Sequence, residues 1–352
     1  MSIRAASPAL AAALLFGAST PLAKLLVGDM PPLLLAGLLY LGSGIGLGLV
    51  LLLRIAHGGA EVRKTMTVPK HERPWLLGAI FFGGMLGPAL LMWGLTQTSG
   101  ATASLLLNVE GVMTAVIAWV VFKENADRNV VLGMLAIVAG GVLLSWEPGG
   151  AAISSGALLV LGACLCWGID NNLTRKVSTN DATFIACCKG LLAGLCNTTL
   201  ALAMGSNHPA WGTVGASMAV GFLGYGLSLT LFVIGLRTLG TARTGAYFSV
   251  APLFGVVISF TLWREAPTAA FWCATALMAL GIWLHLRERH EHEHTHMFLE
   301  HSHRHVHDEH HQHAHAFAVT ADKAHSHPHR HAALTHRHPH YPDIHHRHIH
   351  AK

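Results

Sequence analysis

The sequence predicts an all-α membrane protein with ten transmembrane helices, built as two inverted five-helix repeats and followed by a disordered, histidine-rich cytoplasmic tail. Three observations lead to this prediction: the composition, the placement of the basic residues, and an internal repeat. The chain has 352 residues, of which 52% are hydrophobic and 12% are charged. Soluble domains average roughly 25% charged residues, so this composition argues against a soluble enzyme. The hydrophobicity excludes a chain that is disordered throughout.

Ten apolar segments are long enough to be considered as membrane helices, since a helix needs about 20 mostly apolar residues to cross a bilayer. Gly, Pro, Asn and charged residues separate them. Many of the segments are rich in Gly, Ala, Ser and Thr, which lets helices approach closely within lipid. The expected helices cover residues 8–26, 31–53, 75–95, 99–121, 130–146, 153–171, 183–204, 212–236, 243–263 and 268–286.

The basic residues set the expected orientation, because Lys and Arg concentrate in cytoplasmic loops. With the N-terminus inside, the inner side receives 14 Lys and Arg residues, and the outer side receives only two, Lys24 and Arg264. Both termini are therefore expected in the cytoplasm. This bias also accounts for the formal net charge of +5. No single basic face indicates nucleic-acid binding.

The apolar part of the chain is an internal repeat. An offset of 141 residues places Ala101…Glu124 on Ala242…Glu265 without a gap. Each half holds five expected helices, and five is odd, so the second half must enter the membrane in the opposite orientation. Many transporters are built from such inverted repeats around one central site. We expect repeats over residues 1–148 and 149–286, and a tail over 287–352.

Paired motifs at matching places in the two halves point to a family. Phe16-Gly17 and Trp167-Gly168 begin each half, and a basic residue followed by Glu124 or Glu265 ends each fourth helix. These features resemble EamA-type proteins of the drug/metabolite transporter superfamily. The stretches 107–114 and 167–176, together with the tail, resemble a bacterial subgroup that includes nickel/cobalt resistance membrane proteins. The resemblance implies a multi-pass carrier of the bacterial inner membrane that works as an exporter.

Polar residues within the apolar segments are the candidate transport site, since an ionisable group at bilayer depth is costly and usually functional. Glu110 lies in the fourth helix, and its counterpart in the second half is Ala251. A carboxylate there could exchange a proton for a substrate cation; alternatively it only pairs with Lys189. Asp170 aligns with Ser19, and either faces the cavity or pairs with a basic residue at the helix end.

The neighbouring residues complete the candidate transport cavity. Asn108, Asn171 and Asn172 offer neutral oxygen ligands or hydrogen bonds, and helix-to-helix bonding is the alternative. Lys189 is unexpected in a cation carrier. It could form a salt bridge that is released during transport, form a structural ion pair, or extend its ammonium group to the membrane interface. The expected cavity residues are thus Glu110, Asn108, Asp170, Asn171, Asn172 and Lys189.

The tail contains most of the histidines: 24 of the 27 lie from His285 onward. An offset of 35 residues superposes eleven of twelve histidines of the first copy on the second. Imidazole is a good ligand for Ni²⁺, Co²⁺, Zn²⁺ and Cu²⁺, although affinity alone would favour Cu²⁺. The alternative is an extension that chelates metal only in the test tube. The expected ligands are His290, His292, His294, His296, His301, His303, His305, His307, His325, His327, His329, His331, His336, His338 and His340.

Three functions fit these features. The leading hypothesis is a secondary transporter that exports Ni²⁺, with Co²⁺ next, against protons, while the tail captures or senses metal. No phosphate-binding loop is present, so the chain carries no ATPase of its own, and we expect neither an enzyme nor a required cofactor. The second hypothesis is a metabolite or amino-acid exporter with a regulatory tail. The third is a membrane-anchored metal store that acts for other components of a metal-efflux system.

Overall fold

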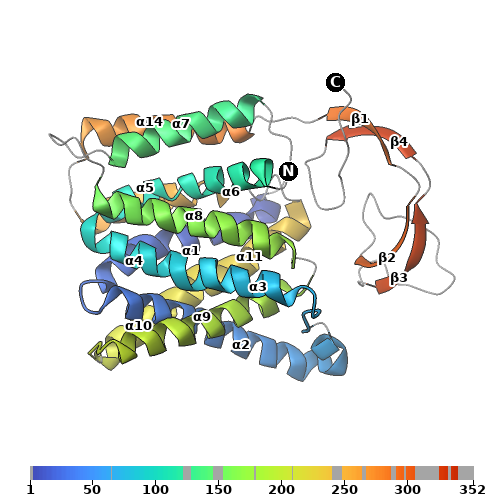
Figure 1. The fold of residues 1–352 in the computed structure, drawn as a ribbon, viewed down its shortest axis with the longest axis horizontal. Coiled ribbons are helices and arrows are strands. Elements are labelled where there is room, and N and C mark those ends of the chain that lie inside the picture. Colours follow the sequence, from blue (N-terminus) through green and yellow to red (C-terminus); the bar gives the residue numbers. More distant parts are fainter. Residues whose placement is uncertain are drawn as a thin grey trace. The chain divides into compact units, whose positions relative to one another are not determined.

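The fold is described from a computed structural model (Figure 1). It describes residues 3–64, 66–121, 128–145, 154–177, 180–207, 209–239, 248–263, 267–286, 291–296, 299–305, 325–331 and 334–339. The chain divides into two compact units, Met1–Glu288 and Arg289–Lys352. The first unit is the body, and the second is the tail.

All the described secondary-structure elements of the body are helices, as the sequence predicts. Two stretches, η1 and η2, are π-helical and interrupt longer helices. The elements are α1 (Ile3–Leu26), α2 (Pro32–Lys64), α3 (Arg73–Ala79), η1 (Ile80–Leu86), α4 (Gly87–Gln97), α5 (Gly100–Leu106), α6 (Val109–Val120), α7 (Arg128–Ser145), α8 (Ser155–Arg175), α9 (Ala182–Ala203), α10 (Trp211–Gly221), η2 (Phe222–Leu227), α11 (Ser228–Leu239), α13 (Ala251–Leu262) and α14 (Ala269–Leu286).

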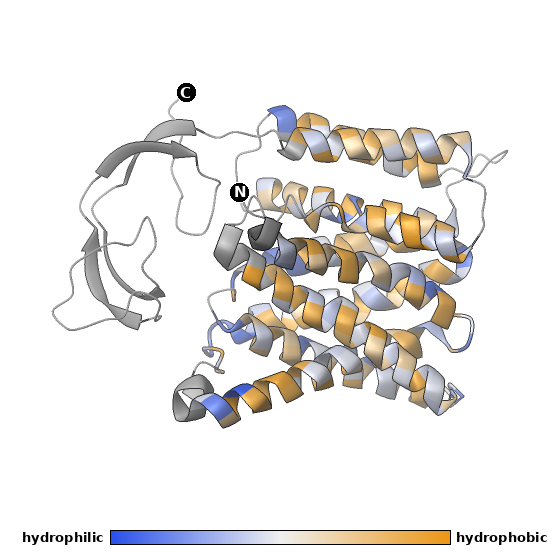
Figure 2. Ribbon diagram, turned by 180° about the vertical axis from the view of Figure 1, so that it is seen from behind, coloured by the Kyte–Doolittle hydropathy of each residue, from blue (hydrophilic) through white to orange (hydrophobic). Residues whose placement is uncertain are grey.

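The described helices suit a membrane protein. Seven are long and apolar enough to cross a bilayer, and three shorter apolar helices cover Val131–Ser145, Ala251–Leu262 and Ala269–Leu284. Hydrophobic residues occur along the helices throughout the body (Figure 2), and many large apolar side chains are exposed; Leu52, for instance, is 63% exposed. Exposed apolar side chains in such number suit a surface that faces lipid. A multi-pass membrane protein is therefore confirmed, while the count of ten spans stays a prediction.

Interruptions occur at matching places in the two halves. The span Gly100–Val120 is broken at Leu107 and Asn108, where α5 ends and α6 begins. At an offset of 141 residues from Asn108, Ser249 and Val250 form a turn before α13. The π-helices η1 and η2 correspond in the same way. Broken helices in transporters expose backbone groups and helix ends at the binding site, so these breaks mark where a site can form.

Close crossings between the halves position the site. A Cβ added to Gly168 on α8 would lie 2.9 Å from the Met113 Cβ and 3.0 Å from the Thr114 nitrogen on α6. A Cβ added to the corresponding glycine, Gly17 on α1, would clash with the Ala251 carbonyl on α13. Without a side chain at these glycines the helix backbones nearly touch. Polar groups on α8 therefore reach those on α6 directly.

The tail departs from the predicted disorder in four segments. They are the strands β1 (Glu291–His296), β2 (Leu299–His305), β3 (His325–His331) and β4 (Leu334–Pro339). β1 pairs with β4 and β2 with β3, both antiparallel. The physical reason is the alternation of histidine with other residues, which has the period-two pattern of a strand, combined with a second copy that supplies a partner strand. The tail is thus not disordered throughout.

Candidate functional site

The centre of the candidate site is the first turn of α6, immediately after the break in the helix. Glu110 lies in that turn, where the partial positive charge of a helix N-terminus favours a carboxylate. The Asn171 side-chain amide on α8 donates hydrogen bonds to Glu110 Oε1 at 3.0 Å and to Thr114 Oγ1 at 3.1 Å. The crossing at Gly168 brings these two helices close enough for both bonds.

A second polar cluster is centred on Asp170, the residue that precedes Asn171 on α8. Lys189 Nζ on α9 donates to both carboxylate oxygens of Asp170, at 2.6 and 2.7 Å, and its distance to Thr174 Oγ1 is 3.3 Å. The Thr174 hydroxyl also donates to Asp170 Oδ1 at 2.8 Å. The two charged side chains are only 13% and 8% exposed. Lys189 therefore forms the ion pair that the sequence left open, with Asp170 as its partner.

Glu110 differs from Asp170 in its partner: Asp170 is bound by a cation, and Glu110 is bound by a neutral amide. Among the ion pairs of the described residues, none includes Glu110, and its side-chain hydrogen bond comes from the neutral amide of Asn171. Glu110 is nevertheless close enough to Asp170 and Lys189 to interact with both charges. With all three groups ionised the formal charges sum to −1. The site thus has one carboxylate whose charge no side-chain cation neutralises by direct contact.

The remaining two predicted residues, Asn108 and Asn172, donate hydrogen bonds to backbone carbonyl groups. Asn172 is buried and donates to the carbonyl oxygens of Thr114 at 3.1 Å and Gly168 at 2.9 Å, so it fastens α8 to α6. Asn108 lies at the break and donates to the Leu105 carbonyl at 2.9 Å. Both side chains thus add a hydrogen bond to carbonyl groups of helix backbone, at the break and at the crossing. The structure brings Glu110 and Asn171 together and gives Asn108 and Asn172 supporting contacts.

Aromatic side chains near the two clusters are not among the predicted cavity residues. The hydroxyl of Tyr40 and the indole N–H of Trp167 both donate to the Gly83 carbonyl in η1, at 2.6 and 2.9 Å. Tyr40 also packs against Tyr225, with 5.4 Å between ring centroids, and Tyr225 against Phe16 at 6.1 Å. Tyr40 interacts electrostatically with both Asp170 and Glu110. One signal was available: Trp167 and Phe16 occupy matching places in the repeat.

A surface ion pair joins α2 to the beginning of α9, outside the polar centre. Arg54 contacts Asp181 at 2.9 Å, and the Asp181 side chain also accepts from the Phe184 backbone N–H at 3.0 Å. Burial by itself would raise the pKa of Asp181. The hydrogen bond from Arg54, that from Phe184 and the guanidinium charge outweigh burial and hold the pKa of this carboxyl below its usual value.

We predict a small acid-dependent loss of stability from this pair. A carboxyl group whose pKa is lower in the folded state stabilises the fold above its unfolded pKa of about 3.9, and the contribution disappears as pH falls through the folded pKa. Arg54 is 41% exposed, so solvent limits the effect to about 1 kcal/mol or less. Thermal unfolding of Asp181→Asn in detergent should show a lower Tm than wild type at pH 7. The gap should narrow toward pH 3, and a gap that does not change with pH would contradict this assignment.

Comparison with known proteins identifies the family. The EamA-like transporter family matches residues 4–146 and again residues 154–287. The chain belongs to this family. A crystal structure of a similar fold aligns at a TM-score of 0.60, with 20% identity over 79% of this chain and 95% of that one. The EamA identification is confirmed, and it places the chain among transporters.

Individual EamA relatives are distant. An uncharacterized transporter of Methanothermobacter thermautotrophicus is 26% identical over 270 residues, which is 72% of this chain and 78% of the relative. A probable terminal-alkyne amino-acid exporter of Streptantibioticus cattleyicolor is 24% identical over 55% of this chain and 67% of its own length. The narrower resemblance to nickel/cobalt resistance proteins stays a prediction.

The EamA body offers little that could hold a metal ion. Among the described residues, no group of three or more His, Cys, Asp or Glu side chains is placed to bind one. The predicted tail ligands lie on β1–β4, except His290, His307 and His340, which fall outside the described residues. Glu124 and Glu265 of the family motif lie outside them as well. The tail ligands and the cavity residues of the body both stay predictions.

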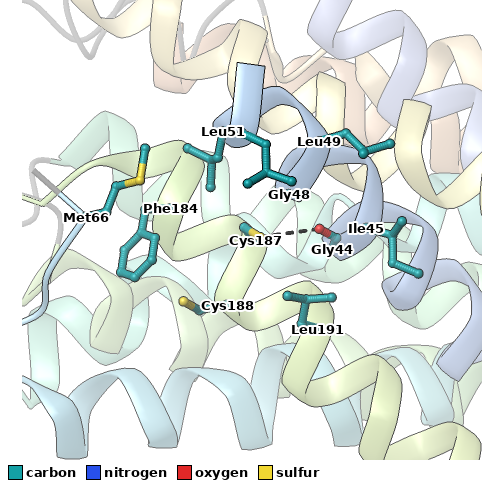
Figure 3. Close-up of a pocket in the computed structure, with 11 residues that line it drawn as sticks. Gly44, Ile45, Gly48, Leu49, Leu51, Met66, Phe184, Cys187, Cys188 and Leu191 are labelled. Carbon is teal, nitrogen blue, oxygen red and sulfur yellow. Dashed lines mark hydrogen bonds between the residues drawn. The ribbon is translucent and has the colours of Figure 1, made fainter. Parts of the chain in front are cut away.

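An apolar groove of about 430 Å³ runs between α2 and α9 (Figure 3). Gly44, Gly48, Cys187 and Cys188 are among its lining residues. The Cys187 thiol donates to the Gly44 carbonyl at 3.3 Å. None of the predicted cavity residues lines this groove, so it is separate from the polar site of the transporter.

Proposed function

We propose that the body exports a small organic solute that carries an ammonium group, amino acids included, and takes up protons in exchange. The observation that carries this proposal is the carboxylate of Glu110. It lies at a helix break, hydrogen-bonds to the neutral Asn171, and is not neutralised by the nearby Lys189, which is bound to Asp170. A carboxylate in this position binds one positive charge, supplied either by a solute or by a proton.

The surroundings favour an organic cation. The site has a formal charge of −1, which one ammonium group neutralises. Tyr40 and Tyr225 pack together beside it, and aromatic faces attract organic cations by about 0.5–2 kcal/mol. The amino-acid exporter among the relatives fits this solute class. The carboxylate of an amino acid would then need a partner, and Lys189, whose charge interacts with Glu110, is a candidate.

Proton exchange follows from the same group. Glu110 cannot hold a proton and an ammonium ion on its negative charge at once, so the two compete. A carrier that binds solute on one side of the membrane and a proton on the other would exchange them one for one. Both termini and the tail would lie in the cytoplasm of a bacterial inner membrane, in keeping with the distribution of Lys and Arg.

Export of Ni²⁺ or Co²⁺ is the second candidate, and the histidine array of the tail favours it. An ion at the polar centre would find Glu110 and the side-chain oxygens of Asn171 and Thr114. Asp170 is bound by Lys189 and would have to be released first. For this reason we assign metal binding to the tail, where it would regulate the carrier or hand metal to an efflux system. The cargo of the body would be organic.

Transport assays in proteoliposomes with a pH gradient test both candidates. Uptake of labelled amino acids and primary amines is compared with that of neutral analogues of the same size, and with ⁶³Ni²⁺. We expect saturable, gradient-driven flux for at least one ammonium compound and none for its neutral analogue. Flux of Ni²⁺ with no flux of any ammonium compound would overturn the proposal in favour of metal export.

A further inference from the structure

The strands of the tail pair the first copy of the 35-residue repeat with the second. β1 and β2 belong to the first copy, and β3 and β4 to the second. β1 pairs with β4 and β2 with β3, so each described ladder joins the two copies and none lies within a copy. In the described strands of the tail, each strand thus takes its partner from the other copy. Both ladders of this arrangement therefore depend on the presence of the second copy.

The register places histidine opposite histidine. Two such pairs occur in the first ladder and three in the second. They are His292↔His338, His294↔His336, His301↔His329, His303↔His327 and His305↔His325. Successive residues of a strand alternate between its two faces, so all histidine positions within a ladder that are two apart share one face. Each ladder therefore has one face on which opposed histidine positions are stacked.

The other face supports the same register. Glu293 lies opposite Arg337 and Glu300 opposite Arg330, and opposite charges across a ladder stabilise it by about 0.2–1 kcal/mol. A slip by one residue would set histidine against Glu or Arg and move each row of histidines to the other face. Two independent features of the sequence, histidine pairing and charge pairing, thus agree with one register.

The pairing is also reciprocal. The 35-residue offset carries His292 to His327 and His303 to His338. The pair His292↔His338 therefore becomes His327↔His303, which is itself a pair in the second ladder. Each copy uses its first strand against the second strand of the other copy. The two ladders are equivalent under exchange of the copies, as expected if duplication created a symmetric unit.

We propose that the two copies together form shared binding sites for divalent transition-metal ions, each ion held by histidines from both copies. Directly opposed residues in an antiparallel ladder have Cβ atoms about 4.5–5.5 Å apart. Two adjacent opposed pairs place four histidine positions on one face of the ladder, and four is the number of ligands in a structural Zn²⁺ site. Imidazole also suits Ni²⁺ and Cu²⁺. The proposal rests on metal binding by the tail and is independent of the cargo of the body.

Zinc titration of the full-length protein in detergent tests the shared site, with the number of Zn²⁺ ions bound as the readout. The first variant is His301→Ala with His303→Ala in β2. It is combined either with the opposed residues, as His327→Ala and His329→Ala, or with the repeat-equivalent residues, as His336→Ala and His338→Ala. The second combination is the matched control, because it removes the same number of histidines from the same copy.

We expect the opposed combination to lose no more Zn²⁺ than the β2 variant alone, because both changes empty the same site. The control combination should lose more, because it also removes the site between β1 and β4. Equal losses in the two combinations would show that the copies bind independently and would overturn the shared site alone. Absence of Zn²⁺ binding in the wild-type protein would overturn metal binding by the tail as well.

Discussion

Replacement of Glu110 by Gln is expected to abolish proton-driven export while leaving the protein folded. Gln retains an oxygen that accepts the Asn171 hydrogen bond, which is 3.0 Å long in the wild type. It removes the negative charge, and it cannot take up a proton. Hydrogen bonds to charged groups contribute about 1.5–3 kcal/mol, so affinity for the ammonium group should fall roughly 10- to 100-fold. Coupling to the pH gradient should disappear entirely.

The measurement is uptake of the ammonium solute into proteoliposomes, with and without a pH gradient. Glu72→Gln is the matched control, since Glu72 is a carboxylate outside the membrane spans that accepts a hydrogen bond from Asn180 at 2.6 Å. The control should transport as wild type does. If Glu110→Gln still responds to the gradient at the wild-type rate, Glu110 is neither the proton carrier nor the cation site, and the proposed function loses its main support.

The fold was largely predictable because the sequence features that indicate it, apolar segments and an internal repeat, are local or periodic. Apolar length identifies helices from composition alone, and the 141-residue offset relates the halves without any structure. Polar residues within apolar segments singled out Glu110, Asp170 and Lys189 for the same reason. Which carboxylate Lys189 binds was not predictable. It depends on the rotation of α9 against α8 and on the close crossing at Gly168, which are properties of packing.

Other features were missed because they arise from backbone geometry. The π-helix η1 presents the Gly83 carbonyl to Tyr40 and Trp167, and no residue pattern marks such a distortion beforehand. In the tail the period-two alternation was visible, but a lack of apolar residues was interpreted as disorder. Only the second copy, matched in histidines and in charge, shows how such a sequence can pair as strands.

Breaking the ion pair between Asp170 and Lys189 should destabilise the protein more than any other single change described above. Both side chains are nearly buried, and removing one partner of a buried pair typically costs about 3–5 kcal/mol because the other charge is left without compensation. Asp170→Asn and Lys189→Met should therefore each lower the unfolding temperature in detergent substantially. Asp170→Asn leaves a buried ammonium group, and Lys189→Met a buried carboxylate.

The double variant Asp170→Asn/Lys189→Met separates a structural role from a transport role. Removing both charges should restore most of the stability, since replacing a buried pair by neutral residues is often close to neutral. The pair has no charged counterpart in the other half, where Ser19 matches Asp170, so the fold itself does not require it.

If Lys189 receives the carboxylate of an amino-acid solute, the stable double variant should carry amines but transport amino acids poorly. Additive losses of stability in the double variant would contradict a direct ion pair. Unchanged amino-acid transport would show that Lys189 only neutralises Asp170.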